Sequence, residues 1–395
     1  MKVLFINTFY YPNVVGGAER SVQFLAETLV KKGHEAIVLS IDKTHGIRTD
    51  RANGVKIYYI GIKNIYWPLE EKNRSTIKMT VWHMLDTLNP FMASEVADIL
   101  KIEQPDVVHT NNLGCFSVAI WEIVKRHHLP LVHTIRDCWL LCIRGSMFRN
   151  DHNCKQQCFR CTVFSYPRKK LSKYVDIVVG VSRFILNKHI SMGYFCKSQK
   201  KVIFNSYEPK EQQIIRPFEP NNIRFGYIGR LTPEKGVKLI LDEFSLVKKD
   251  NITLTIAGTS HDKKYIQYLK NKSGKNVTYI GFVNPEEFYS NIDILIVPSL
   301  WHEPLGRIVF EAYAHGVPVI GSNRGGIPEI IDSGKTGMIF DPDTPGELQQ
   351  HIQWFMDNIH NIEVMRRFCI DKSKMFLPDE IIRQYIEVYK HVLNH

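Results

Sequence analysis

The chain has 395 residues and a net charge of +11, with 44% apolar and 23% charged residues; this composition is typical of packed globular domains and excludes a disordered, collagen-like or coiled-coil protein. At roughly 150 residues per domain, the length predicts two large domains or three small ones. No apolar run reaches the roughly 18 residues that span a bilayer, and the apolar run Val3–Ile6 is too short for a secretion signal, so a cytoplasmic protein is expected.

The first forty residues predict a strand, a helix and a second strand. Lys2–Ile6 is a continuous apolar run, Ala18–Lys32 repeats apolar residues at helical spacing, and Glu35–Ser40 is again apolar. This βαβ order is the building block of parallel α/β sheets. The alternation continues with a strand, a helix and three more strands at 107–109, 116–127, 131–134, 176–180 and 201–204.

A proline-rich stretch without periodicity, residues 207–222, predicts a linker. A second alternation follows it, with strands predicted at 223–228, 252–257, 277–279, 294–297 and 318–321 and helices at 237–248, 263–270, 285–289 and 306–315. The simplest architecture is therefore an α/β protein with two doubly wound parallel sheets joined by one linker.

The net charge divides unevenly across a domain boundary placed at residue 205. Residues 1–205 hold 29 Lys and Arg against 16 Asp and Glu, a net charge of +13, whereas the rest of the chain holds 22 against 24, a net charge of −2. A basic excess confined to one domain favours an anionic partner, which could be a nucleic acid, a membrane or a phosphorylated acceptor.

Loops that follow predicted strands carry candidate binding residues, because ligands of parallel α/β sheets bind at the carboxyl ends of strands. Gly16 and Gly17 precede a helix and would let the backbone approach a phosphate or a sugar. They do not form the G-x-G-x-x-G of a dinucleotide site, which argues against an NAD- or FAD-dependent enzyme. Arg230 and Lys235 follow the first strand of the second domain, where two cations suit a diphosphate.

A further loop after strand 294–297 carries Glu303 and leads into a helix with Glu311. A carboxylate is a good acceptor for two adjacent sugar hydroxyls. The backbone amides at the start of this helix, near Gly306, would face a phosphate.

Together these segments resemble the retaining glycosyltransferases of family 4, also called glycosyl transferases group 1, which have the GT-B fold. The resemblance covers residues 1 to about 345 and is carried by Gly16–Glu19, Gly229–Gly236, Glu303-x7-Glu311 with Pro304 and Gly306, Pro318–Ile320, Gly325–Glu329 and Gly334–Gly337. It implies two Rossmann-like domains that face each other across a cleft. The acceptor-side domain would span 1–205, with a Cys-rich insert at 138–161 and the C-terminal helices 376–395 crossing back to it, and the nucleotide-sugar-binding domain would span 206–375.

The resemblance also implies roles for single residues. Arg230 and Lys235 would hold the donor diphosphate and neutralise the leaving group, and Glu303 would contact the donor sugar, so these three are the expected catalytic residues. Glu311 would accept hydrogen bonds from the donor ribose, and the loop with Val283 would frame the nucleobase. The full set of expected substrate-binding residues is Gly16, Gly17, His109, Asn111, Arg136, Asp137, Val283, Gly306, Arg307, Ile308 and Glu311.

One position departs from the family pattern. The family often has a His-Asp pair after the strand that corresponds to Leu131–Thr134, and here the pair reads Arg136-Asp137. An arginine can bind a sugar hydroxyl or a phosphate but cannot act as a base at neutral pH. The implied mechanism needs no protein base and no cofactor, because the departing diphosphate takes the proton and cations and amide dipoles stabilise its charge.

Five of the eight cysteines lie between Cys138 and Cys161. Four of them have the spacing Cys142-x11-Cys154-x3-Cys158-x2-Cys161, which resembles a small zinc-binding insert. A structural zinc is the favoured interpretation and an iron–sulfur cluster the second. Reduced thiols or two disulfides are the interpretations without a metal.

The sequence therefore predicts a retaining glycosyltransferase that moves a sugar from a nucleotide-diphosphate sugar, with UDP-sugar favoured, to a glycan or lipid-linked acceptor in bacterial surface polysaccharide or glycoconjugate synthesis. The alternatives are a basic zinc-containing nucleic-acid-binding protein and a GT-B nucleotide-sugar epimerase. The expected partners are the donor, the acceptor and an anionic membrane surface on the inner face of the cell membrane; no nucleic acid is expected. Candidate membrane contacts are Arg48, Arg51, Arg74, Arg168, Lys169, Lys170, Lys200 and Lys201, with Tyr66, Trp67 and Trp82 as aromatic candidates for which core packing is the favoured role.

Overall fold

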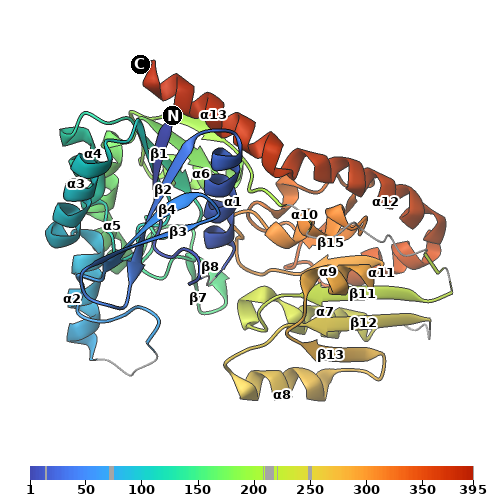
Figure 1. Ribbon diagram of the computed structural model, residues 1–395. Helices are drawn as coiled ribbons and strands as arrows, with labels where there is room; N and C mark the ends of the chain where they lie inside the picture. The colour runs from blue at the N-terminus through green and yellow to red at the C-terminus, as the bar shows by residue number, and fades with distance from the viewer. Residues whose placement is uncertain are drawn as a thin grey trace. The chain divides into compact units, whose positions relative to one another are not determined.

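The computed structural model describes residues 1–13, 16–70, 75–207, 209, 218–219, 221–247 and 251–394, so most of the expected linker 207–222 lies outside the described residues. The chain divides into two compact units (Figure 1). Unit 1 comprises Met1–Met147, Lys155–Ser206 and Pro378–His395. Unit 2 comprises Phe148–Cys154 and Tyr207–Leu377.

Unit 1 is built on a sheet of the strands β1 (Lys2–Ile6), β2 (Glu35–Asp42), β3 (Ile47–Ala52), β4 (Val55–Gly61), β5 (Val107–Thr110), β6 (Leu131–Ile135), β9 (Ile177–Gly180) and β10 (Gln199–Val202). Their order across the sheet is β10-β9-β6-β5-β1-β2-β4-β3. All neighbours are parallel except β3 and β4, which form an antiparallel pair at one edge. The central strands are apolar and fully buried, as expected for strands covered on both faces.

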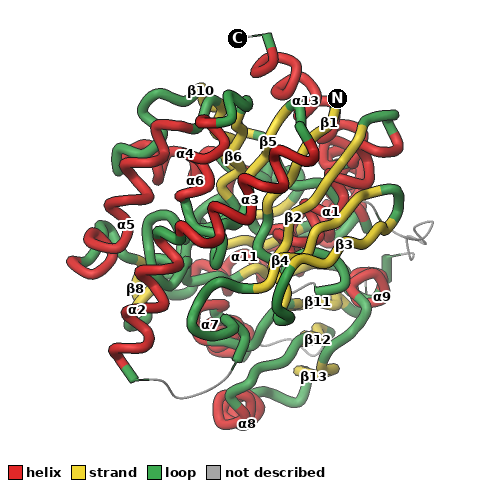
Figure 2. The backbone as a smooth tube through the Cα atoms, turned by 60° about the vertical axis from the view of Figure 1, so that its left-hand side comes forward, coloured by secondary structure: helices red, strands yellow, loops and turns green. Residues whose placement is uncertain are grey.

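The helices of unit 1 are α1 (Gly17–Lys31), α2 (Thr76–Thr87), α3 (Pro90–Glu103), α4 (Ala119–Arg126), α5 (Phe159–Leu171), α6 (Arg183–Ser191) and α13 (Pro378–Leu393), with the 3-10 turn η1 (Ser172–Tyr174). In the view of Figure 2, α3, α4 and α6 lie in front of the sheet. Helices α1 and α13 share a core with the other face, where Leu25 and Tyr389 pack with Val3 and Phe5. The last helix of the chain thus completes the first unit.

Unit 2 has a parallel sheet of β11 (Ile223–Ile228), β12 (Ile252–Ala257), β13 (Val277–Gly281), β14 (Ile294–Val297), β15 (Val319–Ser322) and β16 (Gly337–Phe340), in the order β13-β12-β11-β14-β15-β16. Its helices are α7 (Val237–Phe244), α8 (Lys263–Lys272), α9 (Pro285–Ser290), α10 (Arg307–Ala314), α11 (Glu347–Asp357) and α12 (Ile359–Ser373), with 3-10 turns η2 (Pro233–Lys235), η3 (Ile327–Glu329) and η4 (Lys374–Phe376). A separate core of apolar side chains from this sheet and α7, α11 and α12 holds the unit together.

The two parallel sheets confirm the expected α/β class with doubly wound sheets. The Cys-rich insert, expected at 138–161 within the first domain, is instead divided. Its residues Phe148–Cys154 form the hairpin β7 (Phe148–Arg149) and β8 (His152–Asn153) and belong to unit 2. The reason is local: the Asn153 amide donates to the carbonyl oxygen of Leu300 (2.7 Å), and its Oδ1 accepts from the backbone N–H of His302 (2.8 Å).

Candidate functional site

The loops after β11, β12 and β13 pack backbone to backbone at the carboxyl edge of the unit 2 sheet. Gly258 has φ +134°, and a Cβ there would lie 1.8 Å from the carbonyl oxygen of Gly229. The N–H of Gly258 donates to the carbonyl oxygen of Gly281 (2.6 Å). A side chain at Gly258 is therefore excluded, and the three loops form one surface at the edge where ligands of parallel sheets bind.

Lys235 and Glu303 form an ion pair at this edge. Lys235 ends η2 after β11, and Glu303 follows β14; Lys235 Nζ lies 2.5 Å from Glu303 Oε1. The same oxygen accepts hydrogen bonds from Ser299 Oγ (2.8 Å) and Trp301 Nε1 (3.0 Å). Burial alone would raise the pKa of Glu303, but the Lys235 charge and these hydrogen bonds outweigh it and hold the pKa below its ordinary value. Glu303 is therefore a fixed anion at neutral pH.

Two glycines, Gly325 and Gly326, hold the backbone of Glu303. In the sequence they were noted only as part of the family resemblance. Gly326 N–H donates to the carbonyl oxygen of Glu303 (2.8 Å). Gly325 has φ +65°, and a Cβ there would lie 2.0 Å from that oxygen. Only glycine fits such a close approach, so this segment fixes the loop that carries the carboxylate.

Helix α10 begins one turn after Glu303 and carries Glu311. Its N-cap residue is Gly306, with φ +85° and no side-chain hydrogen bond to the first amides. Arg307 Nε lies 2.5 Å from Glu311 Oε1, and the Tyr289 hydroxyl donates to Glu311 Oε2 (3.2 Å). The carbonyl oxygen of Ile308 lies 3.4 Å from the same hydroxyl, as a second, longer acceptor contact. Glu311 is thus a buried, oriented carboxylate beside a helix start that suits an anion.

The remaining predicted residues of unit 2 lie in the same set of loops. Arg230 is exposed in the loop between β11 and η2, and Val283 is half-buried after β13. Beside Val283, the ring of Phe282 is 87% exposed. The family resemblance assigned this loop, Gly281-Phe282-Val283, to the nucleobase; that the ring of Phe282 is exposed is what the structure adds.

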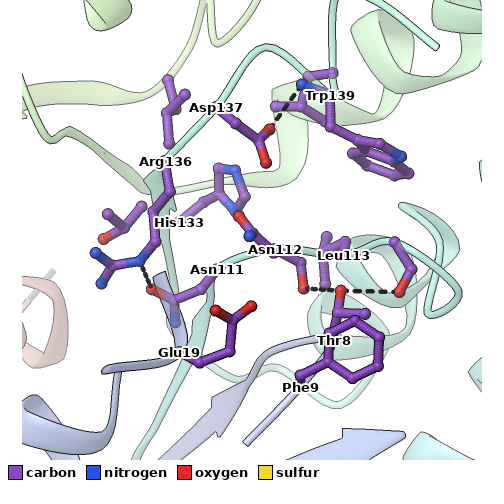
Figure 3. A pocket seen from close by; sticks show the side chains of 14 residues that line it. Thr8, Phe9, Glu19, Asn111, Asn112, Leu113, His133, Arg136, Asp137 and Trp139 are labelled. Carbon is purple, nitrogen blue, oxygen red and sulfur yellow. Dashed lines mark hydrogen bonds between the residues drawn. The ribbon is translucent and has the colours of Figure 1, made fainter. Parts of the chain in front are cut away.

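Unit 1 contains a cavity of about 160 Å³ at the carboxyl ends of β1, β5 and β6 (Figure 3). The predicted residues Asn111, Arg136 and Asp137 line it. Asn112, a cleft candidate from the sequence like Asn111, lines it too. Further lining residues, which sequence reasoning did not assign to a site, are Thr8, Phe9, Glu19, Leu113, Gly114, His133, Thr134, Ile135, Trp139 and Leu140. What they share is their position in the last residues of a parallel strand or in the loop after one, except Glu19, which lies in the first turn of α1.

Two carboxylates, of Asp137 and Glu19, point into this cavity from opposite sides (Figure 3). The backbone N–H of Trp139 donates to Asp137 Oδ1 (2.7 Å), and the backbone N–H of Gly16 donates to Glu19 Oε2 (2.7 Å). Gly16, the N-cap residue of α1, is thereby joined to the cavity wall through Glu19, and Gly17 follows it as the first residue of the helix. Burial raises the pKa of Asp137 to about 6 against the hydrogen bond from Trp139, and the nearby Glu19 adds to the rise.

Arg136 is held by two side-chain amides. Its Nε donates to Asn111 Oδ1 (2.9 Å), and its Nη1 donates to Asn205 Oδ1 (2.6 Å). The guanidinium is largely buried, so the position where the family often has a histidine carries a fixed cation at the cavity.

His109, expected among the substrate-binding residues, lies in the core rather than on the cavity wall. Its Nδ1 lies 2.7 Å from the Tyr389 hydroxyl and its Nε2 lies 2.7 Å from Thr134 Oγ1. Burial, and next the charge of Arg136, lower its pKa well below the ordinary value, so the ring is neutral. This placement makes His109 a link between β5 and α13.

Among the described residues, the four cysteines of the expected metal site form no disulfide, and they are divided between the units. Cys142 and Cys161 are buried, Cys158 is the exposed N-cap residue of α5, and Cys154 belongs to unit 2. Burial raises the pKa of Cys161 to about 12, with Cys142 and Cys158 adding to the rise. Within the described part of the chain, no group of three or more His, Cys, Asp or Glu side chains is arranged as metal ligands. Zinc binding by this insert stays a prediction.

Comparison with known proteins identifies the family. The family described as "Glycosyl transferases group 1" matches residues 209–369, and that described as "Glycosyltransferase Family 4" matches residues 15–210. The chain is 34% identical over 394 residues to an uncharacterized 42.6 kDa protein in the cps region of Klebsiella pneumoniae, covering 99% of this chain and 100% of the relative. It is 24% identical to an uncharacterized glycosyltransferase of Methanocaldococcus jannaschii, covering 99% and 98% of the two chains.

Solved structures agree on the fold. Sucrose-phosphate synthase from Thermosynechococcus elongatus superposes with a TM-score of 0.76 at 17% identity, covering 100% of this chain and 99% of the other. HepE of Anabaena, in complex with UDP and glucose, superposes with a TM-score of 0.69 at 17% identity, covering 99% and 100%. These likenesses confirm the expected GT-B fold. On the sequence matches and the loops described above, the chain belongs to the group 1 family of glycosyltransferases.

Proposed function

We propose that this glycosyltransferase moves a sugar from a UDP-sugar to a glycan or lipid-linked acceptor, with retention of anomeric configuration, in the synthesis of a bacterial surface polysaccharide. The observation that carries the proposal is the Lys235–Glu303 pair at the carboxyl edge of the unit 2 sheet. It sets a cation and a fixed carboxylate side by side, next to the open start of α10. A diphosphate and the sugar attached to it need these two charges at neighbouring points.

The donor nucleotide is supported by further residues of unit 2. The amides at the start of α10, with Arg230 and Lys235, suit a diphosphate. Glu311, oriented by Arg307, suits the two hydroxyls of a ribose. The exposed ring of Phe282 offers a stacking surface to a nucleobase. UDP is favoured because HepE of Anabaena, which shares the fold, has been solved with UDP and with UDP-glucose.

The proposed reaction breaks the bond between the anomeric carbon and the diphosphate oxygen. The acceptor hydroxyl forms the new bond on the face that the diphosphate leaves, and its proton passes to the departing diphosphate. Arg230, Lys235 and the α10 amides stabilise the negative charge of the leaving group. Glu303, ionised at neutral pH, stabilises the positive charge that develops on the sugar.

The acceptor is assigned to the cavity of unit 1, where Asp137 and Glu19 can accept hydrogen bonds from hydroxyl groups. The +13 charge of residues 1–205 supports an anionic acceptor and a peripheral position at the inner face of the membrane. The relative in the cps region of Klebsiella pneumoniae supports a role in surface polysaccharide synthesis.

A thermal-shift panel of UDP-, GDP-, ADP- and TDP-sugars tests the donor, because a ligand that binds the folded state raises the melting temperature. We expect UDP-sugars to give the largest rise, and NMR of the product to show the anomeric configuration of the donor. No rise with any nucleotide sugar, or an inverted product, would overturn the proposal. The larger rise with another base would overturn the UDP assignment.

A further inference from the structure

Helix α2 exposes an apolar stripe along its length. Ile77, Val81 and Met84 follow one another at intervals of four and three residues, which places them on one side of the helix, and Leu88, the C-cap residue, comes four residues later. Each is exposed, with Ile77 at 76% and Met84 at 59%. Apolar residues at helical spacing normally face a core, and here the stripe faces solvent.

Helix α5 repeats the pattern. Phe159, Val163 and Tyr166 are exposed at the same spacing, with Phe159 at 84% and Tyr166 at 64%, and Lys170 continues the stripe. Two contiguous exposed apolar stripes are unusual for a surface that meets only water.

The charges on the two helices are of one sign. Lys78 on α2 and Arg160, Lys169 and Lys170 on α5 are all exposed. The sequences of α2 and α5 contain one carboxylate, Asp86, which is buried and paired with Arg168 (3.2 Å). The exposed sides are therefore apolar and cationic, which complements an anionic lipid surface.

The two helices pack against each other and lie on the same side of unit 1 (Figures 1 and 2). The hydroxyl of Thr87 on α2 donates to the carbonyl oxygen of Phe164 on α5 (3.3 Å). Trp139, which lines the cavity of unit 1, donates from Nε1 to Asp86 Oδ2 (2.9 Å) and lies under the Arg168 guanidinium (3.8 Å to the ring centroid). The helix pair thus adjoins the cavity wall.

These contacts change the membrane candidates proposed from the sequence. Arg168 is fully buried, and the rings of Tyr66 and Trp82 stack on each other (5.5 Å) rather than project. Arg48 pairs with Asp42 on β2, and Arg74 lies outside the described residues. Lys169 and Lys170 are exposed on α5, so their membrane contact stays a prediction.

We propose that the exposed sides of α2 and α5, named here the α2/α5 face, dock on an anionic lipid bilayer and bring a lipid-linked acceptor to the adjoining cavity. The lipid-linked acceptor rests on the proposed function; the docking itself rests on the stripes and their charge. Within the described residues no helix is long and apolar enough to cross a membrane, so this docking is an interfacial contact.

Sedimentation of the full chain with vesicles tests the proposal. Vesicles of phosphatidylcholine mixed with phosphatidylglycerol should pellet the protein at low salt, and vesicles of phosphatidylcholine alone should pellet less. Binding should weaken as the Debye length shortens to about 10 Å at roughly 0.1 M salt. The double variants Ile77→Glu with Met84→Glu and Lys169→Glu with Lys170→Glu should each weaken binding at least about tenfold.

The matched control is Val364→Glu on α12 of unit 2, which also places a charge at an exposed apolar side chain and should leave binding unchanged. Thermal unfolding checks that every variant is folded, and the lysine pair tests the charge of the face without changing any apolar side chain. Parent-like pelleting of both double variants, equal pelleting with the two kinds of vesicle, or none at low salt would overturn the proposal. A dimer in solution that Ile77→Glu with Met84→Glu dissociates would assign the face to a second copy and also overturn it.

The thermal-shift panel separates this proposal from the proposed function. Vesicle binding without a rise in melting temperature for any nucleotide sugar would overturn the proposed function and support the docking face. A rise in melting temperature with UDP-sugars without vesicle binding would overturn only the proposal that the α2/α5 face docks on a bilayer.

Discussion

Replacing Lys235 by alanine removes the cation that pairs with Glu303 and tests whether the pair has the role proposed for it. The two side chains are largely buried, at 20% and 12% exposed, and their charged atoms are 2.5 Å apart. Ser299 and Trp301 would still donate to the carboxylate. The variant therefore loses an ion pair but leaves Glu303 with two hydrogen bonds.

The size of the effect follows from these contacts. A hydrogen bond to a charged group contributes about 1.5–3 kcal/mol, and about 1.4 kcal/mol is a factor of ten in affinity. Loss of the contact to a diphosphate thus predicts UDP binding about ten- to a hundred-fold weaker. Leaving one partner of a fully buried ion pair costs about 3–5 kcal/mol. Because two donors to Glu303 remain and Lys235 is partly solvated, we expect a loss of about 1–3 kcal/mol in the free energy of unfolding.

This loss should depend on pH. The pKa of Glu303 in the folded parent lies below its ordinary value of 4.5, so the stabilisation by the pair is fully present above that value and disappears as the pH falls through the folded pKa. Lys235 makes the largest contribution that lowers the pKa of Glu303 against burial, so without it the carboxyl should take up a proton at higher pH than in the parent. The difference in unfolding free energy between parent and variant should therefore be largest near neutral pH and shrink in acid.

Calorimetry with UDP and thermal unfolding across pH measure the two effects. The control is Lys238→Ala: Lys238 pairs with Asp242 at 2.6 Å on the exposed side of α7, where an ion pair contributes little. Parent-like UDP affinity in Lys235→Ala would refute the contact with the diphosphate. A stability loss that is the same at every pH would refute the ion-pair argument.

Other residues give predictions of the same kind. Glu303→Gln should keep UDP affinity but lower turnover at least about a hundredfold, because it removes the charge beside the reacting sugar; parent-like turnover would contradict this role. Since the pKa of Asp137 is raised to about 6, the carboxyl protonates as the pH falls through that value, so kcat/KM should fall there and Asp137→Asn should abolish this limb of the pH profile. Protein purified without metal-affinity resin should contain about one zinc per chain, lost when Cys158 and Cys161 are replaced by serine; elemental analysis that finds neither zinc nor iron would leave free thiols.

The strands of the two sheets could be predicted where burial on both faces makes them short apolar runs, as in β1 and β14. The edge strand β3 could not be predicted in this way, because three of its six residues are charged and five are exposed. The buried residues of this strand pair belong to its partner β4. Helix α2 was not predicted, although Ile77, Val81 and Met84 recur at helical spacing in the sequence. Such spacing indicates a helix with an apolar side, but it does not show that this side faces solvent.

The site residues of unit 2 were predicted one by one, but their contacts were not. Lys235 and Glu303 are 68 residues apart and meet because β11 and β14 are neighbours in the sheet though not in the chain. Which strands are neighbours depends on the topology of the whole sheet, and the spacing of residues along the chain does not predict that topology. The same holds for Asn153, whose contacts with the loop after β14 could not be foreseen from a Cys-rich insert assigned to the other domain.

Arg136 shows what the departure from the family pattern changes chemically. A histidine there would gain and lose a proton near neutral pH, whereas an arginine held by Asn111 and Asn205 stays charged. Its charge lowers the pKa of His109 below what burial alone gives and opposes the burial that raises the pKa of Asp137. The group at this cavity that titrates closest to neutral pH is therefore the carboxyl of Asp137 and not the histidine of the family pattern. The pH profile of sugar transfer should follow the titration of that carboxyl.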